Sequence, residues 1–108
     1  MLSIALKVLF RRGEEHEETS FSNEVYEALA RSGMRCYRMR GISFICIGEK
    51  SVVVLRRLLP ITARGIPEAD ALFIRVACGQ VPFTECALPV TEIVYDVAKK
   101  LDKPVIPL

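Results

Sequence analysis

Basic and ring-bearing side chains alternate in one short stretch of the chain, between residues 34 and 44. Arg35, Arg38 and Arg40 provide cations, and Tyr37 and Phe44 provide flat apolar rings. A row of cations can hold the phosphates of a polynucleotide, while rings can stack on bases that are not paired with a second strand. This combination predicts a surface that binds single-stranded nucleic acid.

The period of two in this stretch indicates a strand that sends alternate side chains to opposite faces. Arg38 and Arg40 then share one face, and Tyr37 shares the other with Met39. Gly41 can shift this register, because glycine often marks a bulge or a bend in a strand.

Bases elsewhere in the sequence extend the predicted surface. Arg56 and Arg57 end an apolar run that we expect to pair with the first stretch, and Arg64 follows in a loop where it can close a groove. Arg11 and Arg12 join if the first strand of the chain pairs beside the second. In this prediction the arginines hold phosphates and the rings stack on bases. The predicted binding residues are Arg11, Arg12, Arg35, Tyr37, Arg38, Arg40, Phe44, Arg56, Arg57 and Arg64.

Charge is divided unevenly along the chain although the net charge is only +2. Residues 13–30 hold six acids and no base, whereas residues 31–64 hold eight bases and one acid. The second block is a candidate anion-binding surface. Two alternatives remain open: the arginines pair with the acidic block across a fold or subunit boundary, or the protein is a structural or regulatory subunit whose arginine face binds an acidic protein partner.

No pattern in the sequence predicts an enzyme or a cofactor. His16 lies among glutamates with no nucleophile beside it, and neither a GxGxxG nor a GxxxxGK[ST] phosphate loop occurs. Cys86 shortly precedes a predicted helix, but no base is near it to lower the pKa of its thiol. We therefore expect a binding module without a bound metal.

Four cysteines occur, at 36, 46, 78 and 86, and no pair has the CxxC spacing of a zinc site. Burial in the core is their default role. A disulfide is the alternative if the source is a hyperthermophile. The scarcity of amides, with only Asn23 and Gln80 beside many Arg and Glu residues, is typical of such a source.

Seven segments are expected to position these residues within one domain, 1–108. Ser22 is a predicted N-cap, Gly33 a predicted C-terminal stop, and residues 13–20 and 79–89 are predicted loops. The expected elements are strands at 3–11, 35–47, 51–59 and 71–78, helices at 23–31 and 90–101, and a loop at 60–70. The strands on either side of the turn at 48–50 form a hairpin. The order β-α-β-β-β-α predicts an α+β fold: an antiparallel sheet of about four strands packed against two helices.

The apolar content of 51% contains no run long enough to span a membrane. The first apolar stretch precedes its charges, which is the reverse of a secretory signal, so a cytoplasmic location is expected.

The apolar tail at 105–108 is expected to dock on the domain or on another chain. Together with the high apolar content, it indicates a homo-oligomer.

The segments RCYRMRGISF (35–44) and VVVLRRLL (52–59), together with the acidic stretch that follows the first apolar strand, also carry a resemblance. In overall pattern the chain resembles the ThermoDBP-related proteins of archaea, which are themselves similar to the DNA-binding domain of the thermophile-specific single-stranded-DNA-binding protein. The resemblance covers most of the chain. It implies binding of single-stranded DNA without sequence preference and assembly into a homo-oligomer, and it adds no residue to those named above.

Overall fold

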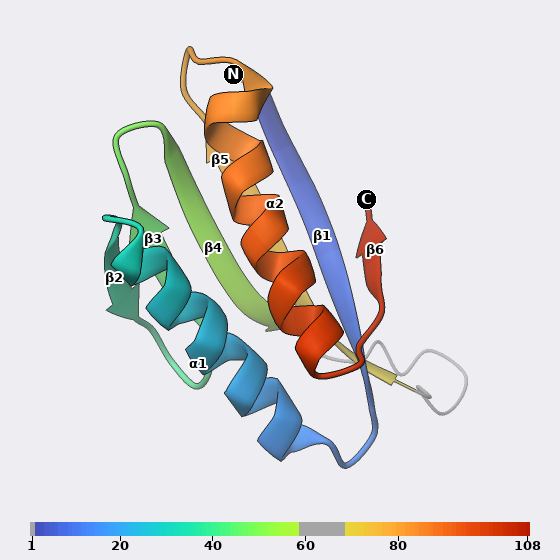
Figure 1. Ribbon diagram of the computed structural model, residues 1–108. Coiled ribbons are helices and arrows are strands. Elements are labelled where there is room, and N and C mark those ends of the chain that lie inside the picture. Colours follow the sequence, from blue (N-terminus) through green and yellow to red (C-terminus); the bar gives the residue numbers. More distant parts are fainter. Residues whose placement is uncertain (1, 59–68) are drawn as a thin grey trace.

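The computed structural model describes residues 2–58 and 69–108. They form six strands and two helices (Figure 1). In chain order these are β1 (Leu2–Arg11), α1 (Glu15–Arg31), β2 (Arg35–Arg38), β3 (Phe44–Ile47), β4 (Ser51–Leu58), β5 (Ala69–Cys78), α2 (Phe83–Lys100) and β6 (Val105–Pro107). The strands pair in the order β2-β3-β4-β5-β1-β6, and every pairing is antiparallel.

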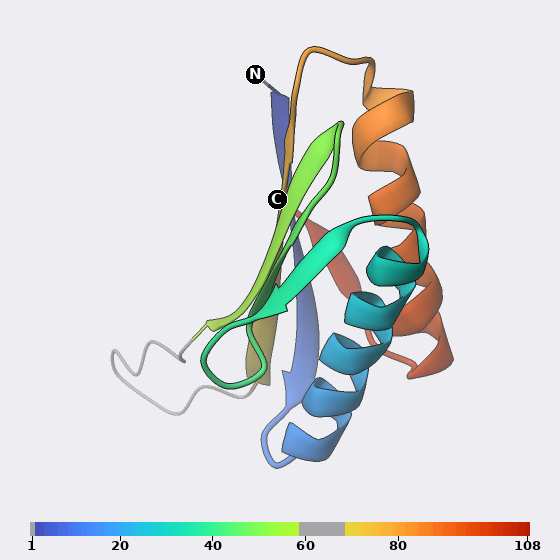
Figure 2. The same cartoon turned by 90° about the vertical axis from the view of Figure 1, so that its left-hand side faces the viewer.

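Both helices lie on the same face of the sheet, as Figure 2 shows from the side. The predicted α+β class and antiparallel sheet are confirmed, but the predicted count of four strands is wrong because the sheet has six. The core fills the space between the sheet and the helices. Its side chains alternate along the strands, as expected for a sheet with one buried face; on β1 and β5 they are Leu6, Val8, Phe10, Leu72, Ile74, Val76 and Cys78.

The first helix begins at Glu15, eight residues earlier than predicted. The loop predicted at residues 13–20 from its charged side chains is wrong from Glu15 onward, because acids suit the positive end of the helix dipole. The predicted N-cap, Ser22, is instead fully buried inside the helix, where its hydroxyl donates a hydrogen bond to the carbonyl of Ile42 (2.6 Å). The predicted end of the helix is confirmed, with Gly33 in the left-handed conformation that glycine adopts easily.

The second helix also begins early, at Phe83 rather than at residue 90, and it includes Pro89. Proline indicated a loop because it lacks an amide hydrogen and disfavours helix interiors. The first turns of α2 are held in place by a disulfide from Cys86 to Cys78 and by the buried side chain of Ala87. These tertiary contacts offset the local cost of the proline.

Two differences account for the extra strands. The expected bent strand at 35–47 is a hairpin of β2 and β3, with Gly41 in the connecting turn at a φ of +67°. The tail forms β6, which pairs with β1, so the prediction that it docks on the domain is confirmed. The predicted hairpin around residues 48–50 is confirmed by the pairing of β3 with β4. Most of the predicted loop at 60–70 lies outside the described residues.

None of the described helices is both long enough and apolar enough to cross a membrane.

Candidate nucleic-acid interface

The face of the sheet opposite α1 and α2 is not covered by any helix of the described chain (Figure 2). The pairing register arranges its outward side chains in rows that cross the strands. One row contains Tyr37, Ile45, Val54, Arg75 and Ala5. The next contains Arg56, Phe73, Lys7 and Ile106. We call this surface the open face.

The open face is basic. The outward positions of its described strands hold five bases and no acid: Lys7, Arg11, Arg35, Arg56 and Arg75. None of these five takes part in the ion pairs found within residues 2–58 and 69–108. Cations that have no carboxylate partner keep their full attraction for an anionic ligand, so this surface favours phosphate.

Phe73 lies near the middle of the open face with a cation on each side. Arg56 on β4 and Lys7 on β1 are its direct cross-strand neighbours. The Arg56 guanidinium carbon is 5.7 Å from the centre of the ring, and Arg75 lies two residues further along β5 on the same face. Phe73 is partly exposed. A ring surrounded by cations can stack on a base while the cations contact the adjacent phosphates.

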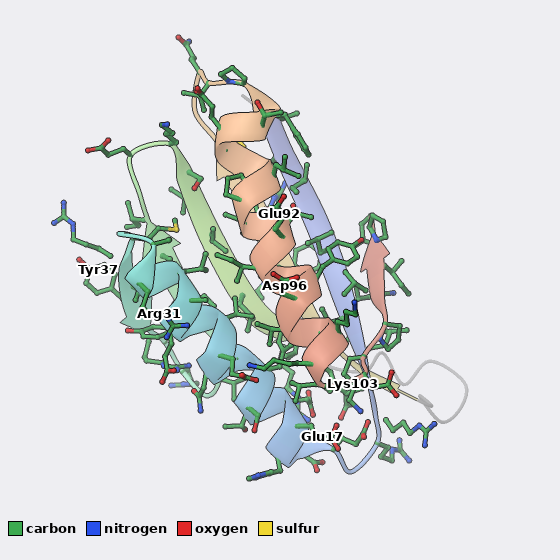
Figure 3. The ribbon with its side chains drawn as sticks, viewed as in Figure 1. Glu17, Arg31, Tyr37, Glu92, Asp96 and Lys103 are labelled. Atoms are coloured by element: carbon green, nitrogen blue, oxygen red, sulfur yellow. A yellow bond between two sulfur atoms is a disulfide. The ribbon has the colours of Figure 1, made fainter. Side chains whose placement is uncertain are left out.

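Tyr37 provides a second ring at the β2 edge of the open face. Half of it is exposed (50%), and Figure 3 shows it on the outer side of the strand. Ile45 and Val54 lie between it and Arg75 in the same row. Arg35 precedes it on the same strand face. Within β2 the predicted division is confirmed, since Tyr37 faces away from the helices whereas Arg38 faces them. Met39 and Arg40, which the prediction placed on the same strand, lie beyond its end.

Arg38 and Phe44 do not lie on the open face, although the sequence placed them in the same site as Tyr37. Phe44 is 0% exposed and packs edge-to-face against Tyr26, with ring centres 5.3 Å apart. Its predicted stacking on a base is wrong because no part of its ring reaches solvent. Arg38 lies over the Tyr26 ring at 4.1 Å and donates hydrogen bonds to the side chains of Asn23 and Ser22.

Arg57 also faces the helices, because it follows Arg56 and adjacent strand residues point to opposite faces. Its Nε lies 3.3 Å from Oε1 of Glu18, and its Nη2 lies 3.2 Å from Oδ2 of Asp70. The predicted phosphate role of Arg57 is therefore corrected: two carboxylates already neutralise it. For this residue the alternative of pairing with the acidic block is the one that the structure supports.

Glu18 is the most deeply placed member of that group, with only 1% of its side chain exposed. Burial raises the pKa of its carboxyl above the ordinary glutamate value, and the nearby Arg57 charge opposes this increase. Its Oε1 has the ion-pair contact with Arg57 but no hydrogen bond. The group holds the N-terminal half of α1 against the end of β4, which is a structural role.

The remaining predicted arginines lie at the periphery or beyond it. Arg12 is exposed in the turn between β1 and α1, and Arg40 is exposed in the turn between β2 and β3. Arg11 ends β1 at an outward position opposite Ala69. Arg64 lies outside the described residues. The structure thus brings Arg11, Arg35, Tyr37 and Arg56 onto the open face out of the ten predicted residues.

Sequence reasoning missed Lys7, Phe73 and Arg75, which lie at the centre of the open face. A signal for two of them existed. Lys7 and Arg75 are the only charged residues within two otherwise apolar runs, and a single charge in such a strand must point away from the core. That rule does not show that the two strands are neighbours, so the cluster was not predictable from it.

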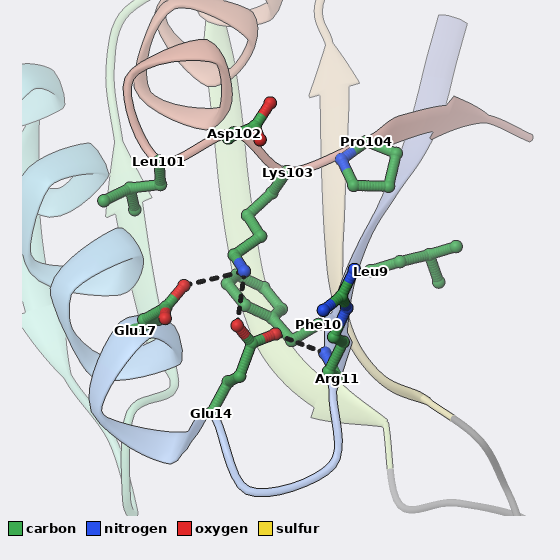
Figure 4. Close-up of a pocket in the computed structure, with 9 residues that line it drawn as sticks. All are labelled: Leu9, Phe10, Arg11, Glu14, Glu17, Leu101, Asp102, Lys103 and Pro104. Carbon is green, nitrogen blue, oxygen red and sulfur yellow. Dashed lines mark hydrogen bonds and ion pairs between the residues drawn. The ribbon is translucent and has the colours of Figure 1, made fainter.

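Figure 4 shows a different polar site, a pocket of about 480 Å³ where the loop before β6 meets the start of α1. Lys103 Nζ lies 2.7 Å from carboxylate oxygens of both Glu14 and Glu17. Hydrogen bonds from Lys103 and from the Arg11 amide lower the pKa of Glu14, and the two carboxylates raise the pKa of Lys103. Because Lys103 bridges two carboxylates at the start of α1, the contact holds the segment before β6 against that helix.

The four cysteines form two disulfides, Cys36–Cys46 and Cys78–Cys86. The sequence left core burial and a disulfide as alternatives; the structure has the disulfides, and it also buries Cys46, Cys78 and Cys86 in the core. Cys86 is therefore not a free nucleophile.

His16 lies exposed in the first turn of α1. In residues 2–58 and 69–108, no three metal-ligating side chains gather in one place.

No protein-family model matches the chain, and no curated protein matches it at a significant level. The resemblance to ThermoDBP-related proteins therefore stays a prediction from the sequence pattern.

Proposed function

We propose that the open face binds single-stranded nucleic acid without sequence preference, with single-stranded DNA as its ligand. The observation that supports this most is the pairing of two partly or half exposed rings, Phe73 and Tyr37, with cations that no carboxylate of residues 2–58 and 69–108 neutralises. An unpaired base offers a flat surface to a ring, at about 1–3 kcal/mol for each stacked base. A base inside a duplex does not, so duplex DNA binds less tightly in this proposal.

The experiment is a fluorescence anisotropy titration of a labelled oligothymidylate of about 16 nucleotides, long enough to fill a site of ordinary size. It compares the parent protein with Arg56→Ala/Arg75→Ala. The matched control is Arg31→Ala/Lys99→Ala, which removes two exposed charges from the helices and leaves the net charge the same as in the test variant. Figure 3 shows Arg31 on α1, on the helix side of the molecule.

We expect the open-face variant to lose about 10-fold or more in affinity, because each phosphate contact contributes to a salt-dependent attraction. The control should lose much less. Equal losses in the two variants would show attraction by net charge alone, and no loss in either would reject the open face as the site. Parallel titrations with duplex DNA and with RNA of the same length decide between the ligand classes.

The competing proposal, an acidic protein partner for the same cations, differs in what it requires of the rings. A ligand held only by charge depends on Arg56 and Arg75 but not on stacking. Replacing Phe73 and Tyr37 by leucine keeps apolar area while removing the aromatic faces. If oligonucleotide affinity survives these changes, the stacking part of the proposal is wrong.

Assembly into a homo-oligomer and a cytoplasmic location remain proposals as well. Leu108 is 65% exposed at the end of β6, which gives another copy an apolar contact. Sedimentation at several protein concentrations measures the assembly. The two disulfides are typical of oxidising compartments or of hyperthermophile cytoplasm, so the cytoplasmic proposal is tied to a hyperthermophilic source.

A further inference from the structure

The two disulfides differ in how a solvent reductant can reach them. Cys78 and Cys86 are 1% and 2% exposed, between the end of β5 and the first turns of α2. Cys46 is fully buried on β3, but its partner Cys36 is partly exposed on β2. Because β2 is the outermost of the described strands, none of them shields Cys36 on that side.

The more exposed of the two disulfides joins a short edge strand to the rest of the sheet. β2 has four residues and, within the described part of the chain, pairs with β3 alone, where Cys36 and Cys46 are direct cross-strand partners. The remaining side-chain ties to α1 are few. Tyr26 Oη donates to the Cys36 carbonyl (2.9 Å), and Arg38 contacts Tyr26, Asn23 and Ser22. A short edge strand with so few ties opens more readily than the central strands.

Both open-face residues of β2 are next to the bridged cysteine in sequence. Arg35 and Tyr37 flank Cys36 and point to the open face, while the bridge itself lies on the helix side. The cations around Phe73 lie on β4, β5 and β1, which pair with one another over eight or ten positions. Freeing β2 would therefore displace Tyr37 and Arg35 but leave the Phe73 cluster in place.

We propose that Cys36–Cys46 is a redox-active site that exchanges with an external dithiol, and that its reduction frees β2 and disables the Tyr37 end of the open face. The effect on ligand binding rests on the proposed function. The selective reduction and the release of β2 do not.

The exchange follows ordinary thiol–disulfide chemistry. A thiolate of the dithiol attacks Sγ of Cys36, forms a mixed disulfide and expels the Cys46 thiolate, which takes up a proton. The second thiol of the reductant then gives up its proton and attacks its own sulfur of the mixed disulfide. The Cys36 thiolate leaves and is protonated in turn. Two electrons pass to the protein, and the dithiol becomes a disulfide.

The first measurement requires no ligand. The native protein is treated with increasing dithiothreitol, alkylated, digested and analysed by mass spectrometry, while hydrogen exchange is followed on the peptide that covers residues 34–43. We expect Cys36 and Cys46 to be alkylated at lower reductant than Cys78 and Cys86, with faster exchange in β2 and unchanged exchange in β5. Simultaneous reduction of both pairs, earlier reduction of Cys78–Cys86, four free thiols before treatment, or unchanged exchange in β2 would each overturn the proposal.

The second measurement titrates labelled oligothymidylate into the oxidised and the selectively reduced and alkylated protein. Reduction should weaken binding by about tenfold, the size expected from one lost stacked base. Cys36→Ser/Cys46→Ser should bind the oligonucleotide with the affinity of the reduced parent, and adding reductant should not change that affinity. Tyr37→Ala/Arg35→Ala should bind weakly in both redox states, because the groups that reduction displaces are already absent.

The outcomes separate the two proposals. If the oxidised protein binds no oligonucleotide, the proposed function fails, and the exchange data alone decide whether the redox site exists. If the oxidised protein binds and selective reduction leaves its affinity unchanged, the proposed function stands and the control by Cys36–Cys46 is wrong. If the serine variant does not fold, the selectively reduced and alkylated parent supplies the same comparison.

Discussion

Arginines on the two faces of the sheet differ in their side-chain partners. On the face covered by α1 and α2, Arg57 is paired with Glu18 and Asp70, and Arg38 lies on Tyr26. On the open face, Arg56 and Arg75 have no acidic partner among the described residues. The buried charges on the covered face are the carboxylates of Glu18 and Asp70, and a buried charge needs a counter-charge, which Arg57 provides. Cations of the open face lie in water and need no such partner. The face of the sheet on which an arginine lies therefore determines whether it stabilises the fold through contacts with neighbouring side chains or can bind a ligand.

Neighbours in sequence show the difference most sharply. Arg56 and Arg57 are adjacent and chemically identical. Arg56 is proposed to bind phosphate, whereas Arg57 forms ion pairs with the buried carboxylates of Glu18 and Asp70. The same contrast holds for the rings, since Phe44 lies in the core and Phe73 on the open face. Matched substitutions on the two faces should therefore separate stability from binding.

The largest effect is expected from the two phenylalanines. Phe44→Ala should lower the free energy of unfolding by about 3–5 kcal/mol, because it leaves a cavity in the core. Phe73→Ala should cost less than about 1 kcal/mol of stability but weaken oligonucleotide binding by about tenfold. Denaturant unfolding and anisotropy titrations measure the two quantities. If Phe73→Ala lowered the free energy of unfolding as much as Phe44→Ala does, the distinction between a core ring and an open-face ring would be wrong.

The adjacent arginines should give the next largest contrast. Arg57→Ala should lower the free energy of unfolding by about 2 kcal/mol, since it leaves Glu18 buried without its counter-charge while the lost guanidinium was itself partly exposed. Its effect on oligonucleotide affinity should be small. Arg56→Ala should have a small effect on the free energy of unfolding and should weaken oligonucleotide binding. If both variants weaken binding equally at equal stability, Arg57 also belongs to the binding surface.

A smaller effect is expected in the dependence of binding on salt. Each phosphate contact removed should reduce the slope of log K against log salt by about 0.7, the value for single strands. Lys7→Ala and Arg75→Ala should each show this change between about 50 and 200 mM salt. Lys99→Ala on α2 should leave the slope unchanged. A Lys7→Ala variant with the parental slope would remove β1 from the interface.

The smallest effect is expected from the buried acid of the covered face. Burial raises the pKa of Glu18, so the folded state favours its protonated form more strongly than the unfolded state does. Its contribution to stability is therefore present in full at pH values below the ordinary glutamate pKa and is lost as the pH rises through the raised pKa. Relative to Glu18→Gln, the parent should become more stable as the pH falls toward about 4. The opposite trend in denaturant unfolding would show that Arg57 outweighs burial.

Sequence patterns predicted much of the fold because the period of the apolar residues is a local property. The hairpin around residues 48–50, the opposite directions of Tyr37 and Arg38 and the end of α1 followed from alternation and from Gly33. The starts of both helices did not follow. Local signals favoured a loop for the acidic stretch that opens α1 and for the proline in α2, whereas contacts distant in sequence stabilise a helix in both places.

The candidate site was predicted in part for the same reason. Arg35 and Tyr37 stood out because they lie together in one stretch, while Lys7, Phe73 and Arg75 are isolated in sequence and meet only through the pairing of β1, β4 and β5. Arg38 and Arg57 looked equivalent to Arg35 and Arg56 by type. Their partners come from α1 and β5, which the sequence does not place beside them.

The amino-acid sequence by itself determined the α+β class, the alternation that gives each strand an inner and an outer face, and the supply of cations and rings. The tertiary structure alone decided which of those cations face a carboxylate and which face water. The physical reason is that periodicity arises from neighbours along the chain, whereas the pairing of charges depends on strand order and helix placement, which bring distant residues together.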